Sequence, residues 1–490
     1  MSSLGSPPAS PAEWITYLDG RLATNQTQLR RYADYYDSTP LPLAFQQARF
    51  QEAFQALFAT WRVNFGGLIV DSISERLKID GFRMTEDPEA DADAWEMWQR
   101  NGLDADSNAA HIDTLALSAS YVVVWGEDGS GEDGPEPVIS PESAMEVAVQ
   151  YKPGSRRELM AALKRYRDDW GREYATLWTP DHVHTSAVEP KPNQRINWND
   201  IQTTDNPLGV VPVVPLYNRT RLLRTPFSEL EPCIPLIDAV TKVAADAIVA
   251  SEYAAFPQRY IAGMEIEEDE NGKAKSQFQI AIDRILMAED PATVFGQFAA
   301  ADLQNYVHLI NALVQQLASI SRIPFHYFLL NGGQAPSGEA ITSAEAGLVN
   351  KARERMIHFG EAWERVMRLA FQVKGDKRAK AFDAEVIWAD PEYQAKGAMI
   401  DGAVKLAQGL DVPKAQLWMD VGYSPQQIAR FPELRQLDYE MAIEKADTLG
   451  LNPDGSVPVA AQNTPASAKK AVDEPVDKTV AKKRPTAKAA

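Results

Sequence analysis

Two long helix patterns that flank a compact insert constrain the fold of this 490-residue chain more than any other feature. The first covers Leu236–Ala255. The second covers Asp302–Ser321, where Asp302 is placed to cap the helix and Pro324 stops it. Each helix would be roughly 30 Å long. Their order predicts two antiparallel rods with a small domain, residues 256–301, at one end. One face of the second rod carries an apolar stripe of Leu303, Val307, Ile310, Leu313, Val314 and Leu317.

A glycine-rich loop, NGGQAPSGEA, leads into a third and longer helix pattern that runs from about Ser337 to Val373. Loops of this kind can cradle phosphates, but this one lacks the Lys-Ser/Thr ending that such loops need, and Pro336 removes one backbone N–H. The adjacent glycines therefore favour a mobile or sharply turned loop over a nucleotide site. Thr342 and Glu345 have the spacing of a capping box, although Ser337 offers an earlier start.

The remaining chain divides into an α+β region before the rods and a helical region after the long helix. SASYVVVWGEDGSGEDGPEPVIS predicts a strand, an acidic turn and a second strand, and strand patterns continue through AMEVAVQY and REYATLWTPDHVHTSAV. FDAEVIWADPEY predicts a closing strand, and short helices follow it. Helical spacing is also found before these strands, at Phe50, Phe54, Leu57, Phe58 and Trp61.

The composition argues against a broad DNA-gripping surface, an internal disulfide and a membrane span. The net charge is −19, and a protein that grips duplex DNA over a broad surface is usually basic. The single cysteine, Cys233, has no partner for an internal disulfide, which favours a reducing compartment. No apolar run approaches the ~18–20 residues that cross a bilayer, and the N-terminus lacks the pattern of a signal peptide. Residues 451–490 are poor in apolar side chains and predict a disordered basic tail.

Candidate catalytic and metal-binding residues are few. His182 and His184 share one face of a strand next to Asp181, but no further ligands follow at a recognisable spacing. Glu354 and His358 share a face of the long helix, together with Glu361, and a solvated helix face explains them better than half of a di-iron site. We therefore expect neither an enzyme nor a bound cofactor.

Five segments, taken in order, resemble the portal proteins of tailed bacteriophages. They are YADYYDSTPLPL, NFGGLIVDSISERLKIDGFRM, NPLGVVPVVPLYNR, PFSELEPCIPLIDAVTKVAADAIVASEYAAFPQRYIAG and PSGEAITSAEAGLVNKARERMIHFGEAWERV. The resemblance covers roughly residues 30–390 and is strongest to portals of long-tailed phages that infect Gram-positive bacteria, especially actinobacteria.

The resemblance implies an α+β portal fold whose parts fall onto the blocks above. The expected parts are an N-terminal arm (1–29), an α+β wing (30–233), a stem helix (234–255), a clip (256–301), a second stem helix (302–322), a tunnel loop (323–340), a long wing helix with a closing strand (341–390), a helical crown (391–450) and the basic tail (451–490).

The resemblance also implies a function and partners. A portal is a ring, typically a homododecamer, at one capsid vertex of the virion. Terminase pumps double-stranded DNA in through its axis, and the DNA is later ejected the same way. The expected partners are other copies of the chain, terminase, the head–tail adaptor, the major capsid protein, scaffold protein and the passing DNA, with assembly in the host cytoplasm and no membrane contact.

Two sets of residues are expected to make the functional contacts. The loop facing DNA would contain Asn331, Gly332, Gly333, Gln334 and Ser337, which carry no charge and no aromatic ring. The clip contacts would be made by Arg259, Lys273, Lys275 and Arg284, for which ordinary surface ion pairs are the alternative.

Two other protein classes remain open at this stage. A cytosolic enzyme with an unrecognised active site would use the helix–insert–helix unit as a lid or a dimerisation arm. Another phage head protein, such as a scaffold or adaptor, fits the length and the α+β region less well.

Overall fold

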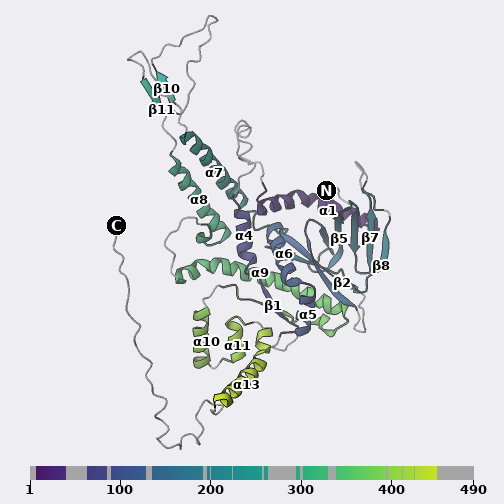
Figure 1. Ribbon diagram of the computed structural model, residues 1–490. Coiled ribbons are helices and arrows are strands. Elements are labelled where there is room, and N and C mark those ends of the chain that lie inside the picture. The colour runs from purple at the N-terminus through teal and green to yellow at the C-terminus, as the bar shows by residue number, and fades with distance from the viewer. Residues whose placement is uncertain are drawn as a thin grey trace, which may run out of the picture. The chain divides into compact units, whose positions relative to one another are not determined.

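The computed structural model describes most of the chain (Figure 1). The described residues are 7–39, 63–84, 90–127, 135–190, 196–198, 200–222, 224–255, 259–262, 294–297, 302–328, 338–392, 396–410, 412–423 and 425–449. The chain divides into two compact units, residues 1–402 and residues 403–490. Both helices and sheets occur in quantity, so the predicted α+β class is confirmed.

The first unit contains a five-stranded antiparallel sheet in the order β4-β5-β6-β7-β8. Helix α1 (Pro11–Tyr36) packs on it through Ile15, Leu18 and Leu22, whose spacing places them on one helix face. Ser10 caps the helix by accepting from the N–H of Glu13. The described part of the predicted arm is therefore continuous with a helix that runs past residue 29. The strands are β4 (Val147–Tyr151), β5 (Leu159–Arg167), β6 (Glu173–Trp178), β7 (His182–Val188) and β8 (Gln202–Asp205).

A second, three-stranded antiparallel sheet has the order β3-β2-β9. Its central strand β2 (Ala119–Glu127) is a run of buried residues over its first six positions, as expected for a strand covered on both faces. β3 (Glu136–Ser143) pairs with β2, which confirms the two predicted strands, and β9 (Val213–Tyr217) lies on the other side of β2. A separate pair joins β1 (Ile79–Arg83) to β12 (Glu385–Trp388), far apart in sequence.

Helix α9 (Gly338–Val373) crosses the centre of this unit (Figure 1). Phe359, Trp363, Val366 and Phe371 are fully buried in the main core. Around α9 lie β2, β3, β9, β12 and α4. The shorter helices are α4 (Phe65–Ser74), α5 (Ala92–Arg100) and α6 (Leu103–Leu117), with 3-10 turns at Phe325–Tyr327 and Lys377–Lys380.

The capping box predicted at the start of α9 is wrong. The helix begins at Gly338, so Thr342 is inside the helix and not at its N-cap. Glu345 is buried and forms an ion pair with Arg76 (3.3 Å) while accepting a hydrogen bond from the Tyr327 hydroxyl (3.1 Å). Its carboxylate thus serves a tertiary contact, which a local spacing rule does not detect.

The two predicted rods are confirmed as helices. α7 (Ile234–Ala255) and α8 (Leu303–Ser321) lie side by side (Figure 1). Asp302 caps α8 as predicted, with its carboxylate accepting from the N–H of Gln304 at 2.9 Å. Beyond the paired helices, β10 (Arg259–Ala262) and β11 (Val294–Gln297) form an antiparallel pair. This pair brings the C-terminal end of α7 and the N-terminal end of α8 together.

The second unit contains helices only, over the residues that are described. α11 (Lys414–Asp420), α12 (Pro425–Ala429) and α13 (Phe431–Leu449) belong to it, and α10 (Lys396–Leu410) begins before it. Trp418 and Tyr423 both pack edge-on against Phe431, so these three rings join α11 to the start of α13. These helices agree with the patterns seen in the sequence.

Several predictions lie outside the described residues. They concern the helical spacing between Phe50 and Trp61, the acidic turn 128–134 and the tail 451–490. Within the described residues, no helix combines the length and the apolar character needed to cross a membrane.

Candidate functional site

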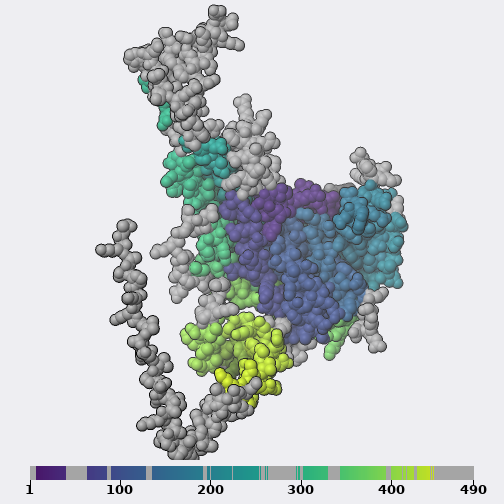
Figure 2. Space-filling view, viewed as in Figure 1, coloured from purple at the N-terminus to yellow at the C-terminus, as the bar shows by residue number. Residues whose placement is uncertain are grey.

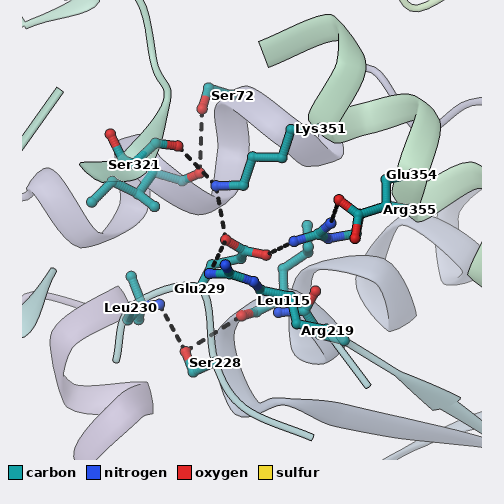
Figure 3. Close-up of polar contacts among 12 residues, drawn as sticks. Ser72, Leu115, Arg219, Ser228, Glu229, Leu230, Ser321, Lys351, Glu354 and Arg355 are labelled. Atoms are coloured by element: carbon teal, nitrogen blue, oxygen red, sulfur yellow. Dashed lines mark hydrogen bonds and ion pairs between the residues drawn. The ribbon is translucent and has the colours of Figure 1, made fainter. Parts of the chain in front are cut away.

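A buried cluster of charges lies where the paired helices meet the long helix α9 (Figure 3). At its centre is Glu229, which lies in the turn before α7. The side chain of Glu229 has no solvent exposure. Lys351 of α9 places its Nζ 2.8 Å from Glu229 Oε2, and Arg355 of α9 pairs with Oε1 of the same carboxylate. Arg219 lies at 3.9 Å. We call Glu229, Lys351 and Arg355 the junction triad.

The local sequence explains why the triad forms. Lys351 and Arg355 are four residues apart, so they project from the same face of α9. Glu229 is held by its backbone, since its N–H donates to the carbonyl of Leu115 at the end of α6 (2.9 Å). The hydroxyl of Ser228 donates to the same carbonyl and accepts from the N–H of Leu230. The carboxylate therefore faces α9 from a rigid turn.

The charges in the triad change one another's pKa values. Burial alone would raise the pKa of Glu229, but Lys351 and Arg355 outweigh it and lower that pKa to about 2. Burial lowers the pKa of Lys351, and Glu229 offsets part of that effect. A carboxylate with this pKa is ionised at all physiological pH values. Removing one partner would leave an uncompensated buried charge, which is costly.

Lys351 also holds the end of α8. Its Nζ donates to the carbonyl of Ser321, the last residue of that helix, at 2.9 Å. Arg322 follows with a positive φ of 59° and closes the helix through its N–H to Ala318. A cation at this position also interacts favourably with the helix dipole. One lysine of α9 thus contacts both the end of α8 and the turn that starts α7.

The far half of α8 differs from the half at the junction. Val314, Leu317 and Ala318 are buried in the main core. Val307, which belongs to the predicted apolar stripe, is 51% exposed, and Leu309, which lies outside that stripe, is 48% exposed. Figure 2 shows the surfaces of α7 and α8 next to each other, and α7 is the described helix that packs along α8. Val307 and Leu309 are two residues apart and therefore project from different sides of α8, so each is a separate candidate for contact with another molecule.

The residues predicted to contact DNA and the clip partners lie mostly outside the described structure. Asn331, Gly332, Gly333, Gln334 and Ser337 are all outside the described residues, as are Lys273, Lys275 and Arg284. Only Arg259 has a described backbone, and it pairs in register with Gln297 at the start of β10. The described structure therefore brings none of these side chains together.

The histidines noted in the sequence are held by local contacts. His182 Nδ1 lies 3.3 Å from Asp205, and His184 Nδ1 lies 2.9 Å from the hydroxyl of Thr203. Glu354, His358 and Glu361 are exposed on α9. Among the described residues, no three His, Cys, Asp or Glu side chains are grouped as a metal site would require.

Sequence reasoning did not identify the junction triad. A signal was present, because Lys351 and Arg355 interrupt the buried face of α9 formed by Leu348, Ala352 and Met356. Charged residues on an apolar helix face call for a buried partner. Their partner, Glu229, is 126 residues from Arg355, and no local pattern points to it.

Comparison with known proteins identifies the family. Residues 26–422 match the model described as phage portal protein, SPP1 Gp6-like. The portal protein of Mycobacterium phage L5 is 30% identical over 447 residues, which cover 88% of this chain and 89% of that protein. The portal protein of Mycobacterium phage D29 is 32% identical over 448 residues, with coverage of 88% and 89%.

A chain from a solved structure titled as the virion of a native gene transfer agent particle aligns over 81% of this chain and 98% of its own length. It has 12% identity and a TM-score of 0.43. The family match and the two phage relatives extend over most of this chain. They support the portal family, the first of the interpretations that the sequence had left open. The chain belongs to the phage portal protein family.

Proposed function

We propose that copies of this portal protein form a closed ring, a dodecamer in the expected case, at one vertex of the phage capsid. Double-stranded DNA passes through the axis of the ring during packaging and ejection. The observation that carries the proposal is the exposed apolar surface on the far half of α8, at Val307 and Leu309. A single chain gains nothing by exposing such residues, whereas a neighbouring copy would bury them.

The free energy gained by burying Val307 and Leu309 at each interface is small, and a closed ring repeats that gain at every interface. Burying one exposed Val or Leu side chain contributes about 1.5–3 kcal/mol at most, and these two are already half-buried. Each contact is therefore modest, but it recurs at every interface of a closed ring. The α7–α8 pair would form the wall of the channel, with β10 and β11 at the start of the clip.

The junction triad gives the wall a fixed base in this proposal. Lys351 contacts both the end of α8 and Glu229, so α9 holds the two wall helices at one point. Buried and paired charges have few alternative arrangements of similar energy. Forces on the wall would pass into the core of the first unit through this point.

The uncharged loop after Ile323 is proposed to face the DNA. Asn331, Gly332, Gly333, Gln334 and Ser337 carry no charge that would hold the phosphate backbone in one register. An acidic wall around them would repel the duplex and centre it, with screening beyond roughly 8–10 Å at cellular salt.

Adding charge to this loop tests its position. Gln334→Lys and Ser337→Lys should each slow DNA packaging and make it more sensitive to salt, because every copy in the ring adds one cation. Asn108→Lys, on an exposed site of α6, is the matched control and should leave packaging unchanged. Normal packaging with both loop variants would show that the loop does not face DNA.

The clip is proposed to dock terminase and later the head–tail adaptor, through Arg259, Lys273, Lys275 and Arg284. The test is Arg259→Glu. Loss of terminase binding with a normal ring would support the docking role, and a normal ring with normal terminase binding would remove Arg259 from it. Contacts with the major capsid and scaffold proteins, and assembly in the host cytoplasm, belong to the same proposal.

The experiment that tests the proposed function directly is the mass and shape of the purified protein. Analytical ultracentrifugation should give a mass near that of a dodecamer, and negative-stain images should show rings with a central hole. Chains that stay single at all concentrations, in the presence of scaffold protein, would contradict the proposal.

A further inference from the structure

A cluster of exposed arginines lies on the first unit, on two loops of which one also carries Glu229 of the junction triad. It is formed by two loops, residues 152–158 between β4 and β5 and residues 219–231 before α7. Together they contain six Lys or Arg residues and three Glu, in a chain whose net charge is −19. Arg156, Arg157, Arg221 and Arg224 are exposed, and we call these four the arginine patch.

The two loops are fixed to one another and to α9. The guanidinium of Arg156 donates to the carbonyl of Leu222, which joins the loops directly. Arg365 of α9 donates to the carbonyl of Arg157 at 3.0 Å. The backbones of Arg221 and Arg224 form a bridge. These contacts hold the two loops of the patch in a fixed arrangement.

Phe227 packs against two arginines of its own loop, residues 219–231. Its ring has the guanidinium carbon of Arg219 4.7 Å from its centroid and that of Arg224 at the same distance. Arg224 also pairs with Glu231 at 3.3 Å. By contrast, the side chains of Arg157 and Arg221 have no acidic partner within the described part of the chain. These two exposed charges are available to another molecule.

The exposed side chain of Leu222 favours a protein over a nucleic acid as the partner of the arginine patch. It is 79% exposed and lies in the sequence directly beside Arg221. A phosphate backbone offers no apolar surface for a leucine, whereas a protein interface combines arginines with buried apolar side chains. A second copy of this chain also supplies the opposite charge, since its net charge is −19.

We infer that the arginine patch, together with the exposed Leu222 beside it, is a contact surface for an acidic face of the neighbouring copy in the ring. This inference rests on the proposed function. It adds a second contact, on the α+β part of the chain, to the one proposed for α8. The patch would set the orientation of adjacent copies through charge, and α8 would contribute apolar burial.

The test compares ring dissociation in three variants of the full chain. Arg157→Ser/Arg221→Ser removes the two unpaired charges, and Leu222→Ser removes the exposed apolar side chain. Lys377→Ser/Lys380→Ser is the matched control, because it removes two exposed positive charges elsewhere on the first unit. Dissociation is followed by mass photometry across a dilution series at several salt concentrations, and circular dichroism checks that each chain is folded.

We expect both patch variants to dissociate at protein concentrations at least about tenfold higher than the wild type, with the control unchanged. The double arginine variant should also show a weaker dependence on salt, because it has fewer ionic contacts. Rings of the patch variants with unchanged dissociation would overturn this inference alone. The same holds if their only defect is weaker binding of a duplex DNA fragment. A wild-type chain that never forms a ring would overturn the proposed function and this inference together.

Discussion

Helices α8 and α9 are both long and amphipathic, but only α9 has its large apolar side chains fully buried within the single chain. α9 is surrounded by strands and helices, and its large side chains Phe359 and Trp363 are fully buried. α8 buries Leu317 near the junction and leaves Val307 half exposed further along. The comparison separates the part of the molecule that is packed within one chain from the part that a neighbouring copy would cover in the proposed ring.

The junction triad is the boundary between these two parts. On one side of it, Arg355 and Lys351 belong to the buried face of α9, and on the other side Ser321 ends α8. Buried charges at such a point cost energy to desolvate and are stable only when fully paired. Changes at the triad should therefore have the largest effect on the chain itself.

Glu229→Gln should cause the largest loss. It leaves Lys351 and Arg355 buried without their carboxylate, and we expect the free energy of unfolding of the dilute, unassembled chain to fall by about 3–5 kcal/mol. Denaturation in urea measures it. Glu385→Gln, which removes the exposed partner of Arg83, should cost less than about 1 kcal/mol. Equal losses in the two variants would mean that the triad is not a buried, coupled cluster.

Within α8, Leu317→Ala should lower the unfolding free energy by about 2–5 kcal/mol, because it opens a cavity in the core. Val307→Ala should change it by less than about 0.5 kcal/mol in the unassembled chain, since the side chain is half exposed there. Urea denaturation of both variants gives the contrast. A large loss from Val307→Ala would indicate that this half of α8 is already packed within one chain.

The contribution of Glu229 should depend on pH. Its pKa is lowered from 4.5 to about 2 in the folded chain, so the unfolded chain binds the proton first. The stability it provides is complete above pH 4.5 and is lost as the pH falls towards 2. The difference in unfolding free energy between the wild type and Glu229→Gln should therefore shrink over that range. A constant difference at pH 3 and pH 7 would contradict this assignment.

Val307→Ser should cause the smallest change in free energy at any one contact. It should weaken the contact between copies and leave the stability of the single chain unchanged. We expect each copy–copy contact to weaken by about 1 kcal/mol, with the fold of the chain unchanged. Because the contact recurs around a ring, the assembled fraction at a fixed concentration should drop sharply in sedimentation runs. Gln304→Ser, an exposed polar position on the same helix, is the matched control. Identical assembly of both variants would remove Val307 from the interface.

Much of the fold was predictable because it follows from local periodicity. The spacing of apolar residues predicts α7, α8 and α9, and alternation with turn residues predicts β2 and β3. What the sequence could not supply were partners distant along the chain, such as β1 with β12. The capping box of Thr342 and Glu345 was wrong for a related reason, since Glu345 serves Arg76 and Tyr327 and not a helix cap.

The candidate site was predictable only in part. The family resemblance pointed to a tunnel loop and clip residues, and nearly all of these lie outside the described structure. The junction triad and the arginine patch depend on tertiary contacts, Glu229 with α9 and Arg156 with Leu222. Charge type alone does not distinguish these residues from the many others on the surface.

The most direct test of the account is a cryo-electron microscopy map of the assembled protein at side-chain resolution. We predict a closed ring in which Val307 and Leu309 of each α8 are covered by a neighbouring copy, while Lys351 still contacts Glu229 within each chain. An assembly in which this half of α8 remains open to solvent would contradict the account, as would particles with no axial hole.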